Sequence, residues 1–124
     1  MSDDLQTAHL NPLEGVAIIG IFHTNSPEEQ EIVLQSLIQI TDEVTRHQTG
    51  FISVTMHRSL DGKTVTNIGR WHTVEDLKNA LATPAMLAHR DALGTRFKRD
   101  GSVGRAVYTY YNGQDATSAD QLQA

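Results

Sequence analysis

The chain of 124 residues contains no cysteine, and this absence removes several kinds of chemistry at once. Disulfides, thiolate nucleophiles, iron–sulfur clusters and thiolate zinc sites all require that residue. Long apolar runs are missing too, since none approaches the ~20 residues of a membrane helix, so we expect no membrane partner. The acidic, polar stretch from Met1 to Asp4 is the opposite of a basic secretory leader, and we expect a cytoplasmic protein.

Positive charge is also scarce. Ten Lys and Arg residues against fifteen Asp and Glu residues give a formal net charge of −5. Binding to a phosphate backbone needs the reverse balance, so we expect no nucleic-acid partner. The one small basic cluster, Arg96, Lys98 and Arg99 around Phe97, is predicted to be a solvated loop. The sequence also lacks GxSxG, GxGxxG and P-loop patterns, which argues against serine hydrolysis and nucleotide binding.

The residues that are present fit one domain with polar ends. Residues 1–13 are mostly polar and include an Asn-Pro pair, which predicts a flexible N-terminal arm. Residues 113–124 are small and polar and are predicted to form a flexible C-terminal tail. The domain itself is therefore expected to span residues 14–112.

Within that domain, hydrophobic periodicity predicts four strands and two helices. Ser26 and Pro27 open the first helix with a hydroxyl cap and a proline at its first position, and Thr83-Pro84 restarts the second. Asp61-Gly62 predicts a tight hairpin between the second and third strands. The strands are expected at residues 16–23, 51–58, 64–71 and 105–111, and the helices at 26–47 and 73–94.

The resulting order, β-α-β-β-α-β, is typical of a ferredoxin-like α+β fold. In this fold, a four-stranded antiparallel sheet carries both helices on one face. No third helix is available to cover the other face, and a large exposed apolar sheet is unfavourable in a monomer. We therefore expect a homodimer in which two sheets pack face to face as a dimeric α/β barrel.

The third predicted strand carries the sharpest chemical signal. Alternation places Asn67, Gly69 and Trp71 on one face. Four residues of strand span ~13 Å, the length of a fused three-ring aromatic, with an amide at one end and an indole N–H at the other. Such a face can bind a flat, oxygenated aromatic and stabilise negative charge on its oxygens. Alternatively, Trp71 is a core anchor and Asn67 caps a local backbone group.

A longer motif resembles a known family. Residues 49–57 (Thr-Gly-Phe-Ile-Ser-Val-Thr-Met-His), Asp61-Gly62-Lys63, and residues 67–71 (Asn-Ile-Gly-Arg-Trp) are similar to the pattern of the antibiotic biosynthesis monooxygenases. Thr83-Pro84 with the downstream Arg90 resembles the second helix of the anthrone-oxidising branch of that family. The resemblance covers residues 14–112.

The resemblance implies an enzyme without metal, flavin or haem that uses O₂ as co-substrate. A small polyphenolic substrate, anthrone-like or quinol-like, would lose a proton, reduce O₂ directly and become a quinone. Asn67 and Trp71 would bind the substrate oxygens and the reduced oxygen, and Arg90 would offset negative charge. That branch has a tyrosine six residues after the tryptophan, where this chain has Leu77. The alternative for Arg90 is a solvated helix arginine.

Other functions are less well supported by the residues. The six histidines form no HExxH or His-x-His pair, so no metal site is predicted, although His72 and Asp76 are four residues apart. His23 and His57 are possible general bases, and His89 could face either a pocket or solvent. A non-catalytic, aromatic-binding or stress-associated protein of the same fold remains an alternative. A haem-degrading relative is a weaker alternative, because Leu81 stands near the position expected for a histidine.

Overall fold

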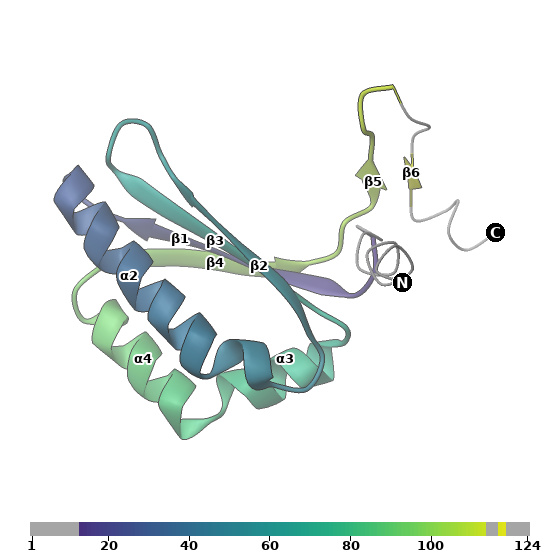
Figure 1. Cartoon of the computed structure of the whole chain (residues 1–124), viewed down its shortest axis with the longest axis horizontal. Helices are drawn as coiled ribbons and strands as arrows, with labels where there is room; N and C mark the ends of the chain where they lie inside the picture. Colours follow the sequence, from purple (N-terminus) through teal and green to yellow (C-terminus); the bar gives the residue numbers. More distant parts are fainter. Residues whose placement is uncertain (1–12, 114–116, 119–124) are drawn as a thin grey trace.

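A computed structural model describes residues 13–113 and 117–118 of the chain. It contains a four-stranded antiparallel sheet with helices packed along one face, which confirms the predicted ferredoxin-like α+β fold (Figure 1). The sheet order is β2-β3-β1-β4. Its strands are β1 (Val16–His23), β2 (Phe51–Arg58), β3 (Thr64–Trp71) and β4 (Arg99–Gly104). The helices are α2 (Pro27–Glu43), α3 (Val74–Leu81) and α4 (Pro84–Gly94), and the short 3₁₀ helix η1 (Thr45–His47) follows α2.

Hydroxyl caps fix the start of all three α-helices. The side chains of Ser26, Thr73 and Thr83 accept hydrogen bonds from backbone N–H groups three residues ahead, at 3.2, 3.0 and 3.3 Å. Each bond satisfies one of the donors that the first helical turn leaves without a partner. The second predicted helix is therefore two helices, α3 and α4, which meet at Thr83-Pro84.

The β2–β3 hairpin is fastened to α2 by a buried amide. Gly62 provides the left-handed conformation that the turn requires, with φ +81°. Nε2 of the buried Gln30 donates to the backbone oxygens of Ser59 and Thr64, at 3.0 and 2.8 Å. This contact fixes the position of β3 relative to the helices, and with it the register of Asn67 and Trp71.

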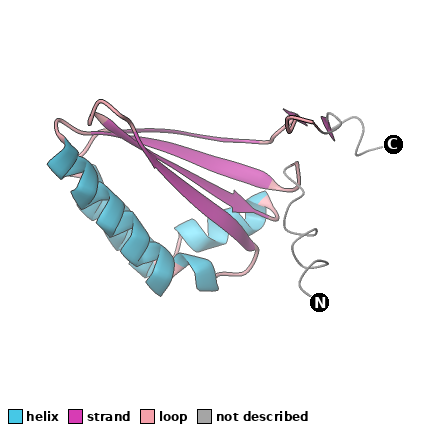
Figure 2. Cartoon of the chain, turned by 45° about the horizontal axis from the view of Figure 1, so that its top comes forward, coloured by secondary structure: helices cyan, strands magenta, loops and turns pink. Residues whose placement is uncertain are grey.

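The described helices lie on one face of the sheet, as Figure 2 shows. Two separate groups of buried side chains lie between the sheet and the helices. One surrounds Val33 of α2 and Val65 of β3, and both of these residues are fully buried. The other packs Trp71 and Val16 against Leu77 and Ala80 of α3. The opposite face of the sheet carries Ile19 and Ile68, which are direct cross-strand partners and only partly buried.

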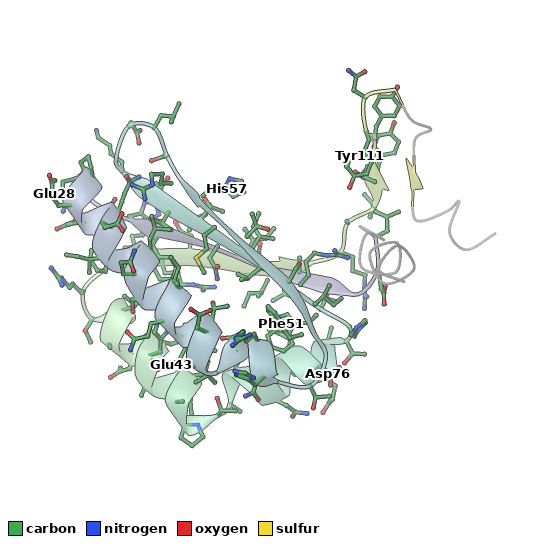
Figure 3. The ribbon with its side chains drawn as sticks, in the orientation of Figure 1. Glu28, Glu43, Phe51, His57, Asp76 and Tyr111 are labelled. Atoms are coloured by element: carbon green, nitrogen blue, oxygen red, sulfur yellow. The ribbon has the colours of Figure 1, made fainter. Side chains whose placement is uncertain are left out.

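The predicted position of the last strand is wrong. The edge strand of the sheet is residues 99–104, which pair with β1 from Ala17↔Gly104 to Phe22↔Arg99. Residues 105–111 contain three tyrosines, one valine and one threonine, which have high strand propensity, whereas residues 99–104 contain two glycines. Here pairing with β1 overrides local propensity. Tyr108, Tyr110 and Tyr111 are exposed, and Tyr111 lies away from the main sheet (Figure 3).

The basic cluster is likewise not a simple solvated loop. Phe97 is 4% exposed and belongs to the first core group, while the guanidinium of Arg96 stacks over its ring at 5.2 Å. Arg99 lies within β4 rather than in a loop.

Two features concern the ends of the described chain. Tyr108–Thr109 (β5) pairs with Thr117–Ser118 (β6), which lies within the segment predicted as a tail. The rest of that tail and all but Leu13 of the predicted N-terminal arm fall outside the described residues. Within the described residues, no helix has both the length and the apolar character needed to cross a membrane.

Candidate active site

A cavity of about 410 Å³ opens between the inner face of the sheet and the helices. Its volume lies within the range of about 300–1,000 Å³ that is usual for small-molecule sites. Most of its wall is apolar, and both core groups contribute to it, through Phe22 and Leu37 on one side and Trp71 and Leu77 on the other. Its polar lining residues are few: Thr41, Thr45, Asn67, His89, Arg90, Asp91 and Arg99.

The face predicted on β3 forms part of this wall. Asn67, Gly69 and Trp71 all line the cavity, as the alternation of the strand predicts. Trp71 is 2% exposed, and the ring of Phe51 meets it edge-on with centroids 5.4 Å apart. Figure 3 places Phe51 at the end of β2 close to α3.

The spacing of β3 alone predicts that the indole N–H of Trp71 and the amide of Asn67 lie at opposite ends of the strand face, and the structure differs. A Cβ built on Gly69 would lie 3.5 Å from the indole Nε1 of Trp71. The indole therefore folds back over Gly69, toward Asn67. The glycine provides space for the indole, and the two donors lie closer together than the ~13 Å span of the strand.

Two buried polar atoms in the described chain have no hydrogen-bond partner. They are Oδ1 of Asn67 and Nδ1 of His89, and both residues line this cavity. A buried polar atom without a partner costs about 1–3 kcal/mol, so such atoms are rare and call for an explanation. Their shared location indicates a site for a polar group of a ligand.

His89 is held by α2. Its Nε2 lies 3.1 Å from Oγ of Ser36. Burial lowers the pKa of His89 below 6.5, and a hydrogen bond to the backbone of Ser36 partly raises it again. When Nε2 donates to the Ser36 hydroxyl, the ring is in the tautomer that carries its proton on Nε2. This tautomer leaves a lone pair on Nδ1, the nitrogen without a partner.

Two guanidinium groups line the same cavity. Arg90 belongs to α4 and Arg99 to β4, and both residues are exposed at the edge of the cavity. Burial lowers the pKa of Arg99, and the positive charge of Arg90 lowers it further. Arg99 stays protonated, because the pKa of a free guanidinium is far above neutrality. The cavity therefore has a positive region beside its apolar wall.

All three residues proposed from the sequence, Asn67, Trp71 and Arg90, therefore line one cavity. His89 was considered without a decision, because its short helix left its direction open. Arg99 was missed, because the strand that carries it was predicted to be a loop. Leu77 and Leu81 also line the cavity, where they provide apolar contacts.

The other histidines of the described chain do not line this cavity. Nε2 of His23 lies 2.7 Å from a carboxylate oxygen of Asp100, and Nδ1 of His72 lies 2.9 Å from one of Glu14. His57 is exposed and lies far from Phe51 along β2 (Figure 3). No group of three or more His, Asp or Glu side chains in the described ranges could hold a metal ion.

Comparison with known proteins gives a consistent result. Residues 17–92 match the family model described as antibiotic biosynthesis monooxygenase. The chain is 36% identical over 74 residues to tetracenomycin-F1 monooxygenase of Streptomyces glaucescens. That alignment covers 60% of this chain and 65% of the relative, which is slightly less than two thirds of its length.

Two solved structures show the same fold. SnoaB, described as a cofactor-independent oxygenase from Streptomyces nogalater, superposes with a TM-score of 0.63 and 25% identity, over 76% of this chain and 94% of that one. The monooxygenase ActVA-Orf6 of Streptomyces coelicolor, in complex with nanaomycin D, gives a TM-score of 0.74 at 21% identity, over 83% and 96% of the two chains.

Proposed function

The chain belongs to the antibiotic biosynthesis monooxygenase family, and from this premise we propose that it is a cofactor-independent monooxygenase. Its substrate would be a polyphenolic aromatic, anthrone-like or quinol-like, and its product a quinone. The observation that carries the proposal is the pair of unpartnered buried atoms, Oδ1 of Asn67 and Nδ1 of His89, in one largely apolar cavity. The hydroxyl groups of a flat polyphenol would donate hydrogen bonds to both atoms, and its rings would fill the apolar space.

The first step of the proposed reaction is removal of a proton from the substrate. Nδ1 of His89 is the acceptor in our proposal, because it is buried, has no partner and bears a lone pair when Nε2 donates to Ser36. Burial lowers its pKa, so the imidazole is neutral at physiological pH and available as a base. Ser36 would act as a positioning residue that fixes the tautomer.

The deprotonated substrate then reduces O₂. Electron transfer to O₂ and recombination give a peroxide on the substrate carbon, and loss of water from the peroxide leaves a carbonyl. For an anthrone, the balance is one CH₂ group and one O₂ converted into one C=O group and one water. In this scheme the protein supplies positioned charge rather than a redox group.

Three side chains are suited to stabilising the negative charge that develops. The indole N–H of Trp71 and the amide of Asn67 can donate hydrogen bonds to the substrate oxygens and to the reduced oxygen species. The guanidinium of Arg90 offsets the net charge. Each interaction is strengthened by the apolar walls, since they exclude water and lower the local dielectric.

The relatives support this chemistry. SnoaB is described as a cofactor-independent oxygenase, and the curated relative is a tetracenomycin-F1 monooxygenase. ActVA-Orf6 binds nanaomycin D in its solved structure. Leu77 occupies the position of the tyrosine of the anthrone-oxidising branch, so our proposal gives that part of the cavity an apolar contact with the substrate.

We also propose that the protein acts as a homodimer. The helices cover one face of the sheet, and the other face carries partly buried isoleucines at positions 19, 21 and 68 (Figure 2). A second copy packed on this face would remove these side chains from water.

The test of the proposed function is oxygen uptake with dithranol, an anthrone. Protein treated with chelator and free of flavin is expected to consume O₂ and to form the quinone faster than the uncatalysed background. Saturable binding of dithranol and related quinols without oxygen uptake would contradict the proposal and favour a non-catalytic aromatic-binding protein.

A further inference from the structure

Gly20 and Gly101 are direct cross-strand partners, and together they leave an area of the inner sheet face without side chains. Phe22 and Asn67, which share this face, line the cavity. We call Gly20 and Gly101 the glycine pair. Glycine has low strand propensity, so two opposed glycines in adjacent strands indicate that something must approach the backbone closely.

The group that approaches is the guanidinium of Arg99. A Cβ on Gly20 would lie 2.7 Å from Nη2 and 2.8 Å from Nε of Arg99, and a Cβ on Gly101 would overlap Nη1. The guanidinium carbon lies 5.8 Å from the centroid of the Phe22 ring. The guanidinium of Arg99 thus occupies the space above the glycine pair, beside the ring of Phe22.

This placement brings the guanidinium beside Asn67. Gly20 pairs with Gly101 on one side and with Asn67 on the other, so all three lie in one row across the sheet. Neighbouring strands are about 4.8 Å apart. A group bound over this row could therefore contact both Asn67 and Arg99.

The positive charge in the cavity is not neutralised by the described part of the protein. In the described residues, ion pairs join His23 to Asp100, Arg58 to Glu31 and His72 to Glu14. None of them involves Arg90 or Arg99. Asp91 is the one acidic residue among the lining residues, and no ion pair joins it to either arginine. An anion bound between or beside these two like charges would relieve their mutual repulsion.

We propose that Arg99, held over the glycine pair, is a substrate-binding residue that forms with Arg90 a subsite for an anionic oxygen group on the aromatic substrate. The group is a carboxylate or an ionised phenol, since both present oxygens that a guanidinium binds well. This inference rests on the proposed function, because it names the charge of the substrate that the same cavity takes.

Binding can be measured without turnover, because Trp71 is the only tryptophan and lines the cavity. The probes are anthraquinone carboxylate, its neutral carboxamide and a hydroxyanthraquinone titrated above and below the pKa of its phenol. Quenching of Trp71 fluorescence is expected to show that the carboxylate binds about 10-fold or more tightly than the carboxamide, and less so at high salt. A gain for the hydroxyanthraquinone on ionisation would identify phenolate as a second anion that the subsite accepts.

Substitutions at Arg99 and at the glycine pair test whether the position of the guanidinium determines the preference for an anion. Arg99→Gln is expected to abolish the preference for the anion, and Arg99→Lys to keep part of it. Gly20→Ala leaves Arg99 present but displaces its guanidinium, and should reduce the preference as Arg99→Gln does. Gly104→Ala is the matched control, because a Cβ there meets nothing within 4 Å. It should bind like the wild type.

Three results would overturn the inference: equal binding of carboxylate and carboxamide by the wild-type protein, no detectable quenching by any probe, or an unchanged preference in folded Arg99→Gln protein. A thermal melt of each variant shows whether it is folded. If anion selectivity is present but dithranol oxidation is absent, the subsite stands and the proposed oxygenase function fails.

Discussion

Asn67 of β3 and His89 of α4 approach one cavity from opposite layers of the fold, and each brings to it a buried polar atom without a protein partner. A fold does not retain such atoms for stability, because each costs free energy that an apolar side chain would not. Their retention is understandable if a ligand completes the hydrogen bonding. Substitutions at Asn67 and His89 are therefore expected to lower activity without lowering the stability of the fold.

Asn67→Leu is expected to lower kcat by about 100-fold, because it removes a group that we place on the developing charge. The same variant should melt at the wild-type temperature or slightly above it, since it removes an unpaired buried oxygen. Steady-state kinetics and calorimetry measure the two effects. Thr41→Val is the control within the cavity, because the Thr41 hydroxyl already donates to the backbone of Leu37 at 2.8 Å. A comparable loss of kcat in Thr41→Val would contradict the assignment.

His89→Gln should reduce kcat by at least about 100-fold if His89 accepts the substrate proton. Ser36→Ala should produce a smaller loss, because the base remains but its tautomer is no longer fixed. The control is His72→Gln, which alters an exposed histidine paired with Glu14. Unchanged kcat in folded His89→Gln protein would remove His89 from the mechanism.

The pH dependence follows from the lowered pKa of His89. The neutral imidazole is the active form, so kcat/KM should fall as the pH decreases through a value below 6.5 and stay level above it. The charged residues lining the same cavity are Arg90 and Asp91 on α4 and Arg99 on β4, while the other described elements contribute uncharged side chains. An acidic limb that persists unchanged in His89→Gln would contradict its assignment to His89.

The same pKa has a consequence for stability. The unfolded chain binds a proton at His89 more readily than the folded chain, because burial disfavours the charged ring. This contribution to the free energy of unfolding is therefore complete above about pH 6.5 and is lost as the pH falls through the lower folded value. In denaturant titrations, the free energy of unfolding of the wild type should fall relative to that of His89→Gln as the pH decreases through this range. Parallel curves would contradict the shift.

Trp71→Phe tests the indole N–H. The variant keeps an aromatic ring against Phe51 but loses the donor over Gly69, and kcat should fall by about 100-fold. Phe51→Leu is the matched control, since it disturbs the same edge-to-face contact and leaves the N–H in place. If both variants lose activity equally, packing rather than hydrogen bonding explains the role of Trp71.

Ile68→Glu tests the proposed homodimer. It places a charge on the sheet face opposite the described helices, where Ile68 is paired with Ile19. The variant is expected to convert a dimer into a monomer in sedimentation velocity at micromolar concentration. Ile32→Glu is the control. Ile32 is exposed on α2, and this helix packs on the opposite face of the sheet from Ile68. A wild-type protein that sediments as a monomer would contradict the proposed assembly.

The sequence predicted the parts of this molecule that depend on local rules. The capped helix starts at Ser26, Thr73 and Thr83 and the hairpin at Gly62 follow from side chains within a few residues, and the structure confirms them. The alternation of β3 likewise predicted that Asn67 and Trp71 share a face.

The sequence could not predict features that depend on contacts between distant segments. Residues 99–104 form the edge strand because they pair with β1, although the tyrosine-rich residues after them have higher strand propensity. Arg99 was therefore hidden in a predicted loop. His89 reaches the cavity through its contact with Ser36, 53 residues earlier in the chain, and no local pattern shows this.

In the proposed reaction, this chain alone, without a metal or organic cofactor, transfers oxygen from O₂ to an aromatic carbon. The most direct measurement is dithranol oxidation under isotopically heavy O₂ by chelator-treated, flavin-free protein, with rapid quenching and mass analysis of the quinone. We expect one heavy oxygen atom in the new carbonyl, with one O₂ consumed for each quinone, and a rate that falls sharply in Trp71→Phe. Oxidation that requires an added metal or flavin, or a quinone whose new oxygen comes from water, would contradict it.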